Sequence, residues 1–340
     1  MSPILGITAS SRPPVPAIGP AIFISTSSSP FINAYAWSSG FGSKYSNPAT
    51  LPSSSQGLSY DVVNNAIAMC GSSGGGSPYL SAYPFSGSGF GTKYADPGTA
   101  LTGESVKSDF RPAGDAVAFA HVTSPRITAY PWSSSGFGTK YSNPGTLPTG
   151  NGYSVRFAPN GNDIVVGHVS SPFISAYPWS SGFGTKYANP STLPGGNGYG
   201  VAFSVGSDQV GIAHGNNGTA TYPWSAGFGT KYANPASMPA GYNVGIEFTS
   251  GAVAIAHTVS PYLSVFPWSP GFGTKYANPA TLPSSGGDIR FKPSGDVLAI
   301  VDNTSPYIKA YAWSGGFGTK YADPATAPSS STNSVVFNNI

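Results

Sequence analysis

The chain has 340 residues, of which 45 are Gly and 33 are Pro, and only 8% are charged, with a formal net charge of +3. Gly and Pro cost roughly 1 and 3 kcal/mol in a helix interior, and exposed helix faces need charge, so coiled coils, helical bundles and Rossmann-type folds are excluded. The 39% of hydrophobic residues suffice for a core, which argues against disorder. The weak charge gives no electrostatic case for a nucleic-acid partner.

Residues 1–19 form the first predicted element, an extended arm that is rich in proline (SRPPVPAIGP from Ser11). Its start lacks the basic residues and apolar stretch of a secretory signal, and the chain contains no run of about 18 apolar residues that would span a membrane. The single cysteine, Cys70, excludes an internal disulfide framework and a Cys-based zinc site. We therefore expect a soluble protein with no signal peptide, no transmembrane segment and no membrane insertion.

Residues 20–340 contain a segment of the form SGFGTKYANPATLP that recurs seven times, once every 44–49 residues. This period is typical of units of four short strands, the size of a propeller blade. In residues 152–194 the strands are GYSVRF, DIVVGH, FISAYPW and TKYANP, and the turns between them are APNGN, VSSP and SGFG. Alternating apolar residues mark the strands, and Asn-Gly supplies the positive φ of a hairpin turn.

The two ends of the repeat region complement each other. AIFIST, residues 21–26, matches the second strand of a unit, whereas NSVVFN, residues 333–338, matches a first strand with nothing after it. Joining them would complete one sheet and remove an open edge. The sequence therefore predicts an all-β, seven-bladed β-propeller of four-stranded antiparallel blades, closed by the C-terminal strand joining the N-terminal blade.

The repeat resembles the WD40 type, on the strength of YSVRFAPNG in the first strand and ISAYPW in the third. A Trp closes the third strand in six blades, and Phe85 replaces it in the second; the tryptophans are Trp37, Trp132, Trp179, Trp224, Trp268 and Trp313. The Asp and Gly-His of true WD40 blades are absent, so the resemblance is WD40-like. The opening ILGITASSR is similar to structural proteins of tailed bacteriophages, which implies a virion protein assembled in the host cytoplasm.

Two side chains of the repeated segment are candidate binding residues, because together they would form a peripheral ring of positive charge beside tyrosine. The lysines are Lys44, Lys93, Lys140, Lys186, Lys231, Lys275 and Lys320, and the tyrosines are Tyr45, Tyr94, Tyr141, Tyr187, Tyr232, Tyr276 and Tyr321. The alternative interpretation is that each lysine protects the exposed edge of its blade from strand addition.

Histidines and acids give no clear catalytic cluster. His121, His168, His214 and His257 each end a second strand, where we expect a hydrogen bond within the blade rather than a metal site. Glu104, Asp109, Glu247 and Asp288 lie in or near first strands and could face the central channel, as could Arg156 and Arg290. We expect no cofactor, no metal and no catalytic residues.

The leading functional hypothesis is a non-enzymatic structural or binding module of a bacteriophage virion, in a tail, fibre or decoration protein that mediates attachment. Its partners would be other virion or scaffold proteins, bound through residues 1–19, and a host-surface glycan. The alternative is a carbohydrate-binding, lectin-like propeller. A third hypothesis, an enzyme with its active site at a channel mouth, requires two or more acids or histidines that converge in one pocket.

Overall fold

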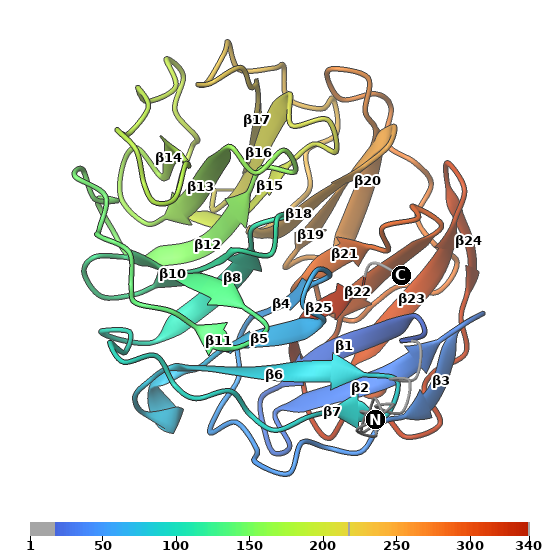
Figure 1. Ribbon diagram of the computed structural model, residues 1–340. Coiled ribbons are helices and arrows are strands. Elements are labelled where there is room, and N and C mark those ends of the chain that lie inside the picture. Colours follow the sequence, from blue (N-terminus) through green and yellow to red (C-terminus); the bar gives the residue numbers. More distant parts are fainter. Residues whose placement is uncertain (1–17, 217, 339–340) are drawn as a thin grey trace, which may run out of the picture.

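The computed structural model describes residues 18–216 and 218–338. Seven small antiparallel sheets surround a central channel, and each sheet is one blade (Figure 1). Within these described residues the one helical element is a short 3-10 turn, Ser73–Gly75. The chain is therefore a seven-bladed β-propeller, as the repeat predicts.

Four blades have four strands each, which follow one another from the channel outwards. Blade 1 contains β25 (Thr332–Phe337), β1 (Ala21–Thr26), β2 (Ile32–Trp37) and β3 (Phe41–Lys44). Blade 2 contains β4 (Leu58–Asp61), β5 (Ala66–Cys70), β6 (Leu80–Ser86) and β7 (Gly89–Phe90). Blade 3 contains β8 (Ser105–Phe110), β9 (Ala116–His121), β10 (Ile127–Ser133) and β11 (Gly136–Phe137). Blade 7 contains β21 (Ile289–Phe291), β22 (Val297–Val301), β23 (Ile308–Trp313) and β24 (Phe317–Lys320).

The other three blades have three full strands and a reduced fourth. Blade 4 contains β12 (Gly152–Phe157), β13 (Asp163–His168) and β14 (Ile174–Pro178). Blade 5 contains β15 (Gly198–Phe203), β16 (Gln209–His214) and β17 (Gly218–Pro223). Blade 6 contains β18 (Asn243–Thr249), β19 (Ala252–His257) and β20 (Leu263–Pro267). Their fourth strands shrink to isolated bridges, Trp179↔Phe183, Trp224↔Phe228 and Trp268↔Phe272.

The position of the fourth strand corrects one detail of the expected blade. The fourth strand begins earlier than expected, at the Phe of SGFG, and in blade 1 it spans Phe41–Lys44 and pairs Phe41 with Trp37 and Lys44 with Tyr35. The rest of the TKYANP segment leaves the ladder after its tyrosine, whose backbone N–H still donates to the third strand, as Tyr187 does to the carbonyl of Ala176 over 2.9 Å. Its prolines supply no N–H for a ladder, which is consistent with that placement.

The C-terminal strand closes the ring. Strand β25 pairs with β1 in antiparallel register, with Ile22 opposite Phe337 and Ser25 opposite Ser334, and Figure 1 shows the two strands side by side. Asn338 extends this seam, because its side-chain oxygen accepts a hydrogen bond of 2.6 Å from the backbone N–H of Ala21. The predicted closure is thus confirmed.

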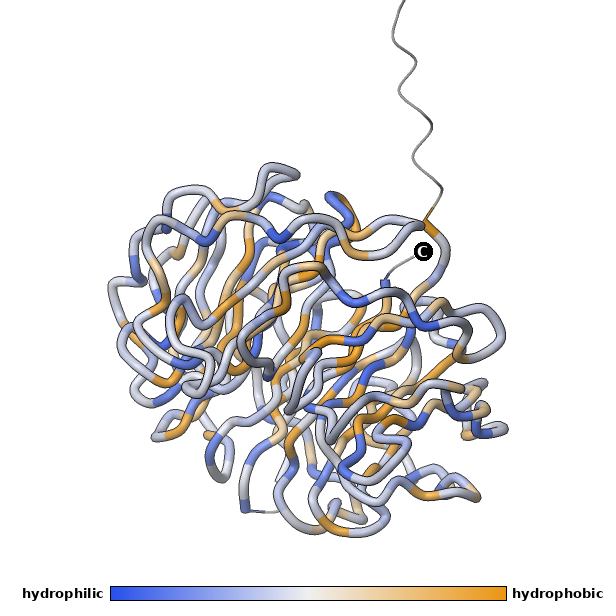
Figure 2. The backbone as a smooth tube through the Cα atoms, turned by 90° about the horizontal axis from the view of Figure 1, so that it is seen from below, coloured by the Kyte–Doolittle hydropathy of each residue, from blue (hydrophilic) through white to orange (hydrophobic). Residues whose placement is uncertain are grey.

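Small residues on one blade pack against large residues on the next. Between blades 3 and 4, Ala116, Ala118 and Ala120 of β9 meet Val155, Phe157 and Trp179 of blade 4, all of them buried. Because side chains alternate along a strand, β9 presents its alanines to blade 4 and its Val117 and Phe119 to the other side. In Figure 2 the hydrophobic stretches, in orange, lie mostly along the strands inside the body.

Hydrogen bonds from tyrosine also join neighbouring blades. In six blades a buried tyrosine of the third strand donates its hydroxyl, over 2.8–2.9 Å, to a threonine carbonyl in the preceding blade; the pairs are Tyr35–Thr326, Tyr83–Thr50, Tyr130–Thr99, Tyr177–Thr146, Tyr222–Thr192 and Tyr311–Thr281. Blade 6 has Phe266 at this position and so lacks the hydroxyl.

Most of the predicted arm, residues 1–19, lies outside the described residues, so the two-part division of the chain and the partners assigned to the arm stay predictions. Among residues 18–216 and 218–338, no helix has the length and apolar character needed to cross a bilayer.

Candidate active site in the central channel

The innermost strands line the channel with two rings of side chains. Six of the seven inner strands have the pattern x-apolar-x-aromatic, and blade 3 has Ser108 at the apolar position. Alternation along the strand turns both x positions away from the packed core. The first ring consists of Gly57, Lys107, Ser154, Gly200, Gly245, Asp288 and Ser334, and the second ring consists of Ser59, Asp109, Arg156, Ala202, Glu247, Arg290 and Val336. We call the two openings the amino mouth and the carboxyl mouth, after the ends of the inner strands that reach them.

The second ring brings two acids and two arginines together. Arg156 donates from Nη1 to Asp109 Oδ1 over 3.2 Å and from Nη2 to Glu247 Oε2 over 3.4 Å. Arg290 Nη1 lies 3.1 Å from the same Glu247 oxygen. Asp109 also accepts a hydrogen bond of 2.8 Å from the backbone N–H of Phe157, which holds its carboxylate in place. Four blades, two consecutive pairs separated by blade 5, thus supply one charged cluster.

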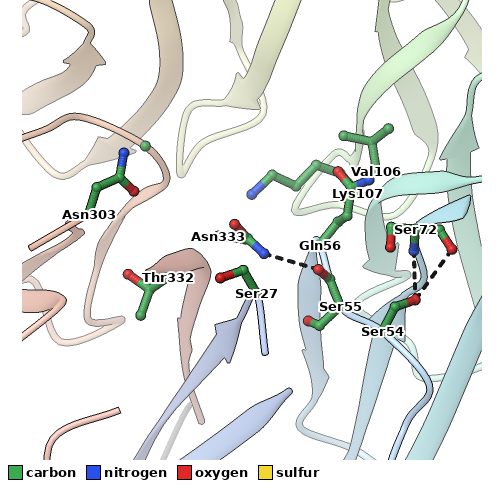
Figure 3. A pocket seen from close by; sticks show the side chains of 11 residues that line it. Ser27, Ser54, Ser55, Gln56, Ser72, Val106, Lys107, Asn303, Thr332 and Asn333 are labelled. Carbon is green, nitrogen blue, oxygen red and sulfur yellow. Dashed lines mark hydrogen bonds between the residues drawn. The ribbon is translucent and has the colours of Figure 1, made fainter. Parts of the chain in front are cut away.

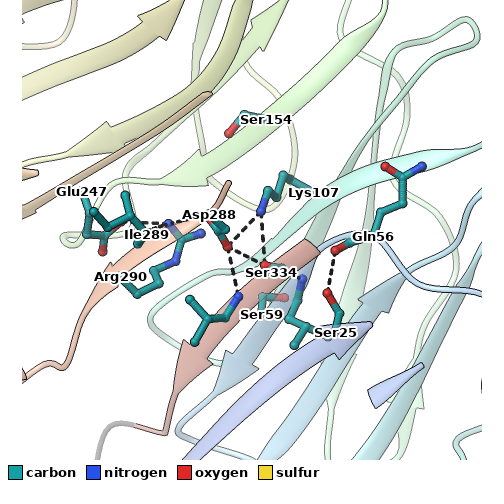
Figure 4. Close-up of polar contacts among 12 residues, drawn as sticks. Ser25, Gln56, Ser59, Lys107, Ser154, Glu247, Asp288, Ile289, Arg290 and Ser334 are labelled. Atoms are coloured by element: carbon teal, nitrogen blue, oxygen red, sulfur yellow. Dashed lines mark hydrogen bonds and ion pairs between the residues drawn. The ribbon is translucent and has the colours of Figure 1, made fainter. Parts of the chain in front are cut away.

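The first ring contacts this cluster through Arg290, and Figure 4 shows Asp288 between Lys107 and Arg290. Asp288 is the centre of these contacts, with Lys107 Nζ at 2.9 Å and Arg290 Nη1 at 3.2 Å from its two oxygens. Ser334 donates its hydroxyl to Asp288 over 2.5 Å. Because Arg290 contacts both Asp288 and Glu247, it joins the two rings.

Burial and neighbouring charges set the protonation of these groups. Burial raises the pKa of Asp109 above its ordinary value, and the Arg156 guanidinium opposes this rise only in part. Burial acts in the same direction on Asp288, but Arg290 and Lys107 outweigh it and hold the pKa of Asp288 well below its usual range. For Arg156, burial disfavours the charged form, yet Glu247 and Asp109 prevail and raise its pKa. The raised pKa makes Asp109 a candidate for proton exchange, whereas Asp288 is held in its charged form.

Two adjoining cavities open on the second ring at the carboxyl mouth. Each has a volume of about 380 Å³, and both are lined by Asp109, Arg156 and Glu247. Phe203 and Pro159 form part of both walls. A carboxylate that can take a proton, next to guanidinium groups that can stabilise a developing oxyanion, is an arrangement suited to general-base attack on a carbonyl.

The amino mouth holds a different cavity, of about 470 Å³ (Figure 3). Hydroxyl and amide side chains such as Ser54, Gln56, Thr332 and Asn333 line it, and Lys107 is its one charged lining residue. Glu104, which was expected near the channel, lies close to this mouth and bonds Gln56 and the backbone N–H of Ser73. It therefore does not join the acids of the second ring.

The seven predicted lysines lie at the periphery, far from these rings. Six of them hold the Asn or Asp three residues further on; the pairs are Lys93–Asp96, Lys140–Asn143, Lys186–Asn189, Lys231–Asn234, Lys275–Asn278 and Lys320–Asp323. Only Lys44 and Lys320 lie in a described strand, so edge protection does not explain the whole set. Each of the six paired lysines stabilises its own outer loop.

The seven predicted tyrosines lock neighbouring blades together. Each packs edge-to-face against the Trp, or Phe85, of the next blade with ring centroids 5.0–5.5 Å apart; the pairs are Tyr45–Phe85, Tyr94–Trp132, Tyr141–Trp179, Tyr187–Trp224, Tyr232–Trp268, Tyr276–Trp313 and Tyr321–Trp37. Gly40, Gly89 and Gly136 sit under such rings at positive φ, where a side chain would be strained. The repetition of GFGTKY thus has a structural cause.

One peripheral cavity, of about 540 Å³ between blades 6 and 7, includes Lys320 and Tyr321 in its wall. Binding by the lysines and tyrosines stays a prediction.

The histidines follow the expectation of hydrogen bonds within the blade. Nε2 of His121, His168 and His257 lies 3.0–3.1 Å from a Ser or Thr hydroxyl on the third strand of the same blade. His214 instead contacts the carbonyl of Gly215 through Nδ1, at 2.5 Å. Across residues 18–216 and 218–338, His, Cys, Asp and Glu side chains form no group of three that could hold a metal ion.

Sequence reasoning placed Asp109, Glu247, Asp288, Arg156 and Arg290 on first strands but did not bring them together. Their convergence depends on which blades are neighbours across a channel, and the chain separates Arg156 from Glu247 by 91 positions. The available signal was that all five occupy the two x positions of the inner-strand pattern, where other blades carry small or apolar residues.

Solved structures of other proteins share this fold at low sequence identity. The periplasmic gluconolactonase PpgL of Pseudomonas aeruginosa has a TM-score of 0.71 and 12% identity, over 94% of this chain and 99% of its own. A candidate 6-phosphogluconolactonase of Bacteroides fragilis has a TM-score of 0.70 and 12% identity, over 94% and 97%. A Lactobacillus plantarum protein has a TM-score of 0.69 and 14% identity, over 93% and 98%. No protein-family model matches the chain, and neither does any curated protein.

These comparisons correct the functional expectations drawn from the sequence. The similar structures that are named for an activity are lactonases, and they are neither virion proteins nor WD40 repeats. The prediction of a non-enzymatic phage module that mediates attachment was therefore wrong, and so were its lectin-like alternative and its virion location. The resemblances behind them misled because near-identical repeats and a closing Trp follow from blade packing, which propellers of unrelated function share.

Proposed function

We propose that the protein is an enzyme that hydrolyses lactones, with its active site in the second ring at the carboxyl mouth. The observation that carries the proposal is the cluster in which Arg156 contacts both Asp109 and Glu247 beside a cavity of about 380 Å³. Such convergence is what the channel-mouth enzyme hypothesis requires. The lactonase names of proteins with the same fold support the choice of reaction.

Asp109 is the general base of the proposed reaction. A water oxygen bonds to the lactone carbonyl carbon while its proton passes to Asp109, and the carbonyl electron pair moves onto the oxygen. When the carbonyl re-forms, the bond from this carbon to the ring oxygen breaks, and the ring oxygen takes the proton from Asp109. The product is the open hydroxy acid. Burial favours this role because it raises the pKa of Asp109 towards the working range of a base.

Arg156 and Arg290 are the proposed stabilisers of the oxyanion. Both are largely buried, with side chains 16% and 9% exposed, so their charges act in a medium that screens them less than water does. Glu247 accepts from both guanidinium groups and so positions them side by side. Asp288 holds Arg290 from the other ring, over 3.2 Å.

A pH-stat assay with δ-valerolactone tests the proposal. We expect the wild-type chain to form 5-hydroxypentanoate faster than buffer does, and Arg156→Met to lower kcat/KM by about 100-fold, the usual loss of one oxyanion-stabilising group. Arg126→Met is the matched control, because Arg126 bonds the carbonyl of Val122 outside both rings. Wild-type activity no higher than buffer, or equal losses in the two variants, would contradict the proposal.

A further inference from the structure

A ring of apolar residues surrounds the carboxyl mouth, above the charged second ring. It is formed by residues just after the inner strand in five blades, and its members are Val62, Pro112, Pro159, Val205 and Pro293. All five are exposed, and each lines at least one of the two cavities that reach Asp109 and Glu247: Val205 and Pro293 line one, Val62 and Pro112 line the other, and Pro159 lines both. A ligand bound to the second ring would therefore contact the apolar ring wherever it extends towards the carboxyl mouth.

The two valines of this apolar ring are departures from the repeat. Blades 3, 4 and 7 have proline at this position, whereas blades 2 and 5 have valine, and Val205 is 63% exposed. The exposed leucines, such as Leu147 and Leu193, belong to the TLP motif of the outer loops, where they recur in several blades, and two further exposed valines, Val63 and Val259, line neither cavity. Exposed valine at the mouth is thus specific to the site and not to blade architecture.

The charged side chains on the same rim are already occupied. Arg111 donates to Asp115 over 2.5 Å and to the carbonyl of Gly161 over 2.8 Å. Lys292 donates to Ser294 over 2.8 Å and lies 3.3 Å from Asp296. Lys292 is held along its own hairpin, and Arg111 is held to its own hairpin and to that of blade 4, so the rim offers a substrate mainly apolar surface.

We propose that the substrates are lactones that carry an apolar substituent, with the ester on the second ring and the substituent against the apolar ring. This inference rests on the proposed lactonase function. Val62 and Val205 are then specificity-determining residues. The methylene groups of the substituent are buried against these two valines, and this burial stabilises the transition state of the larger substrate. A substrate covered with hydroxyl groups would lose hydrogen bonds to water there without replacing them.

Three lactones of one ring size test the inference: δ-decalactone, δ-valerolactone and D-glucono-δ-lactone. We expect kcat/KM to be about tenfold or more higher for δ-decalactone than for δ-valerolactone, and lowest for D-glucono-δ-lactone. The double variant Val62→Ser, Val205→Ser should reduce the ratio of δ-decalactone to δ-valerolactone about tenfold. Leu193→Ser, an exposed aliphatic residue far from the mouth, is the matched control and should leave the ratio unchanged.

The outcomes separate the two proposals. If D-glucono-δ-lactone is hydrolysed faster than δ-decalactone, or if the serine variants leave the ratio unchanged, lactonase function stands and the apolar preference is overturned. If none of the three is hydrolysed above the buffer rate, the lactonase proposal itself fails and the substrate inference fails with it.

Discussion

The outer loops and the inner channel of this propeller contrast in how their residues repeat. GFGTKY and its variants occupy the same outer position in all seven blades, where each tyrosine packs on the next blade. The inner strands share their apolar and aromatic residues, yet their channel-facing positions range from Gly200 to Arg156 and Asp288. Identical contacts made seven times demand identical residues, whereas a single site in the channel demands different ones. In a propeller of near-identical blades, function is therefore to be sought where the repeat breaks.

The largest expected effect comes from replacing the proposed general base in the channel. In Asp109→Asn the amide cannot accept the proton of water, so kcat/KM for δ-decalactone should fall by about 1000-fold. In the wild type kcat/KM should rise with pH through the raised pKa of Asp109, since only the deprotonated carboxylate is a base. Asp323→Asn, in an outer loop, is the matched control and should keep full activity. A pH-independent rate below neutrality would contradict the role of Asp109.

The second effect concerns the support of the channel cluster. Asp288→Asn removes the negative charge that pairs with the buried positive charges of Lys107 and Arg290. The free energy of unfolding should therefore fall by about 3 kcal/mol. Denaturant titration measures this, with the exposed Asp115→Asn as control. Because the pKa of Asp288 is lower folded than unfolded, its carboxylate stabilises the fold above the unfolded pKa, and this stability is lost as pH falls through the folded pKa. If the wild type and Asp288→Asn lose the same free energy of unfolding as the pH falls below the unfolded pKa of Asp288, this role of the carboxylate is contradicted.

A smaller effect is expected at the contacts between blades. Tyr177→Phe removes the hydroxyl that donates to the carbonyl of Thr146 over 2.8 Å, and the free energy of unfolding should fall by about 1 kcal/mol. Blade 6, which has Phe266 at this position, shows that the fold tolerates the loss of one such bond. Lactone hydrolysis should not change. A fall in activity without a fall in stability would show that the contacts between blades serve the reaction, and would contradict the assignment of the reaction to the channel.

The smallest effect is expected at the peripheral lysines. Lys186→Met removes an ammonium group that bonds Asn189 and lies 3.4 Å from the carbonyl of Tyr187, at an exposed loop. Stability should change by about 0.5 kcal/mol or less, and kcat/KM for lactones should stay the same. A tenfold change in kcat/KM would show that the repeated segment serves the reaction.

The sequence predicts the architecture well because each blade repeats the same local information. The period, the alternation in GYSVRF and the unpaired strand at each end suffice for seven blades and for the pairing of β25 with β1. Strand lengths are less predictable: the fourth strands of blades 4, 5 and 6 shrink to single bridges although their sequences nearly match those of blades 1 and 7.

The candidate site is less predictable because it is not a local property. Asp109, Arg156 and Glu247 come from three blades, and their contact depends on the tilt and spacing of strands across the channel. By contrast, the lysines and tyrosines stand out in the sequence because they repeat, yet their repetition reflects loop and blade packing. Residues that stand out by regularity and residues that stand out by chemistry are different sets in this chain.

The central claim is that the reaction takes place where the repeat breaks, in the second ring. A crystal structure of the protein soaked with δ-valerolactam, a lactam that resists hydrolysis, tests this most directly. We expect the lactam in the cavity of the carboxyl mouth, with its carbonyl oxygen within hydrogen-bond distance of Arg156 or Arg290 and its carbonyl carbon facing Asp109. A lactam bound at the peripheral Lys320 and Tyr321 cavity, or in the amino mouth, with the second ring empty, would contradict it.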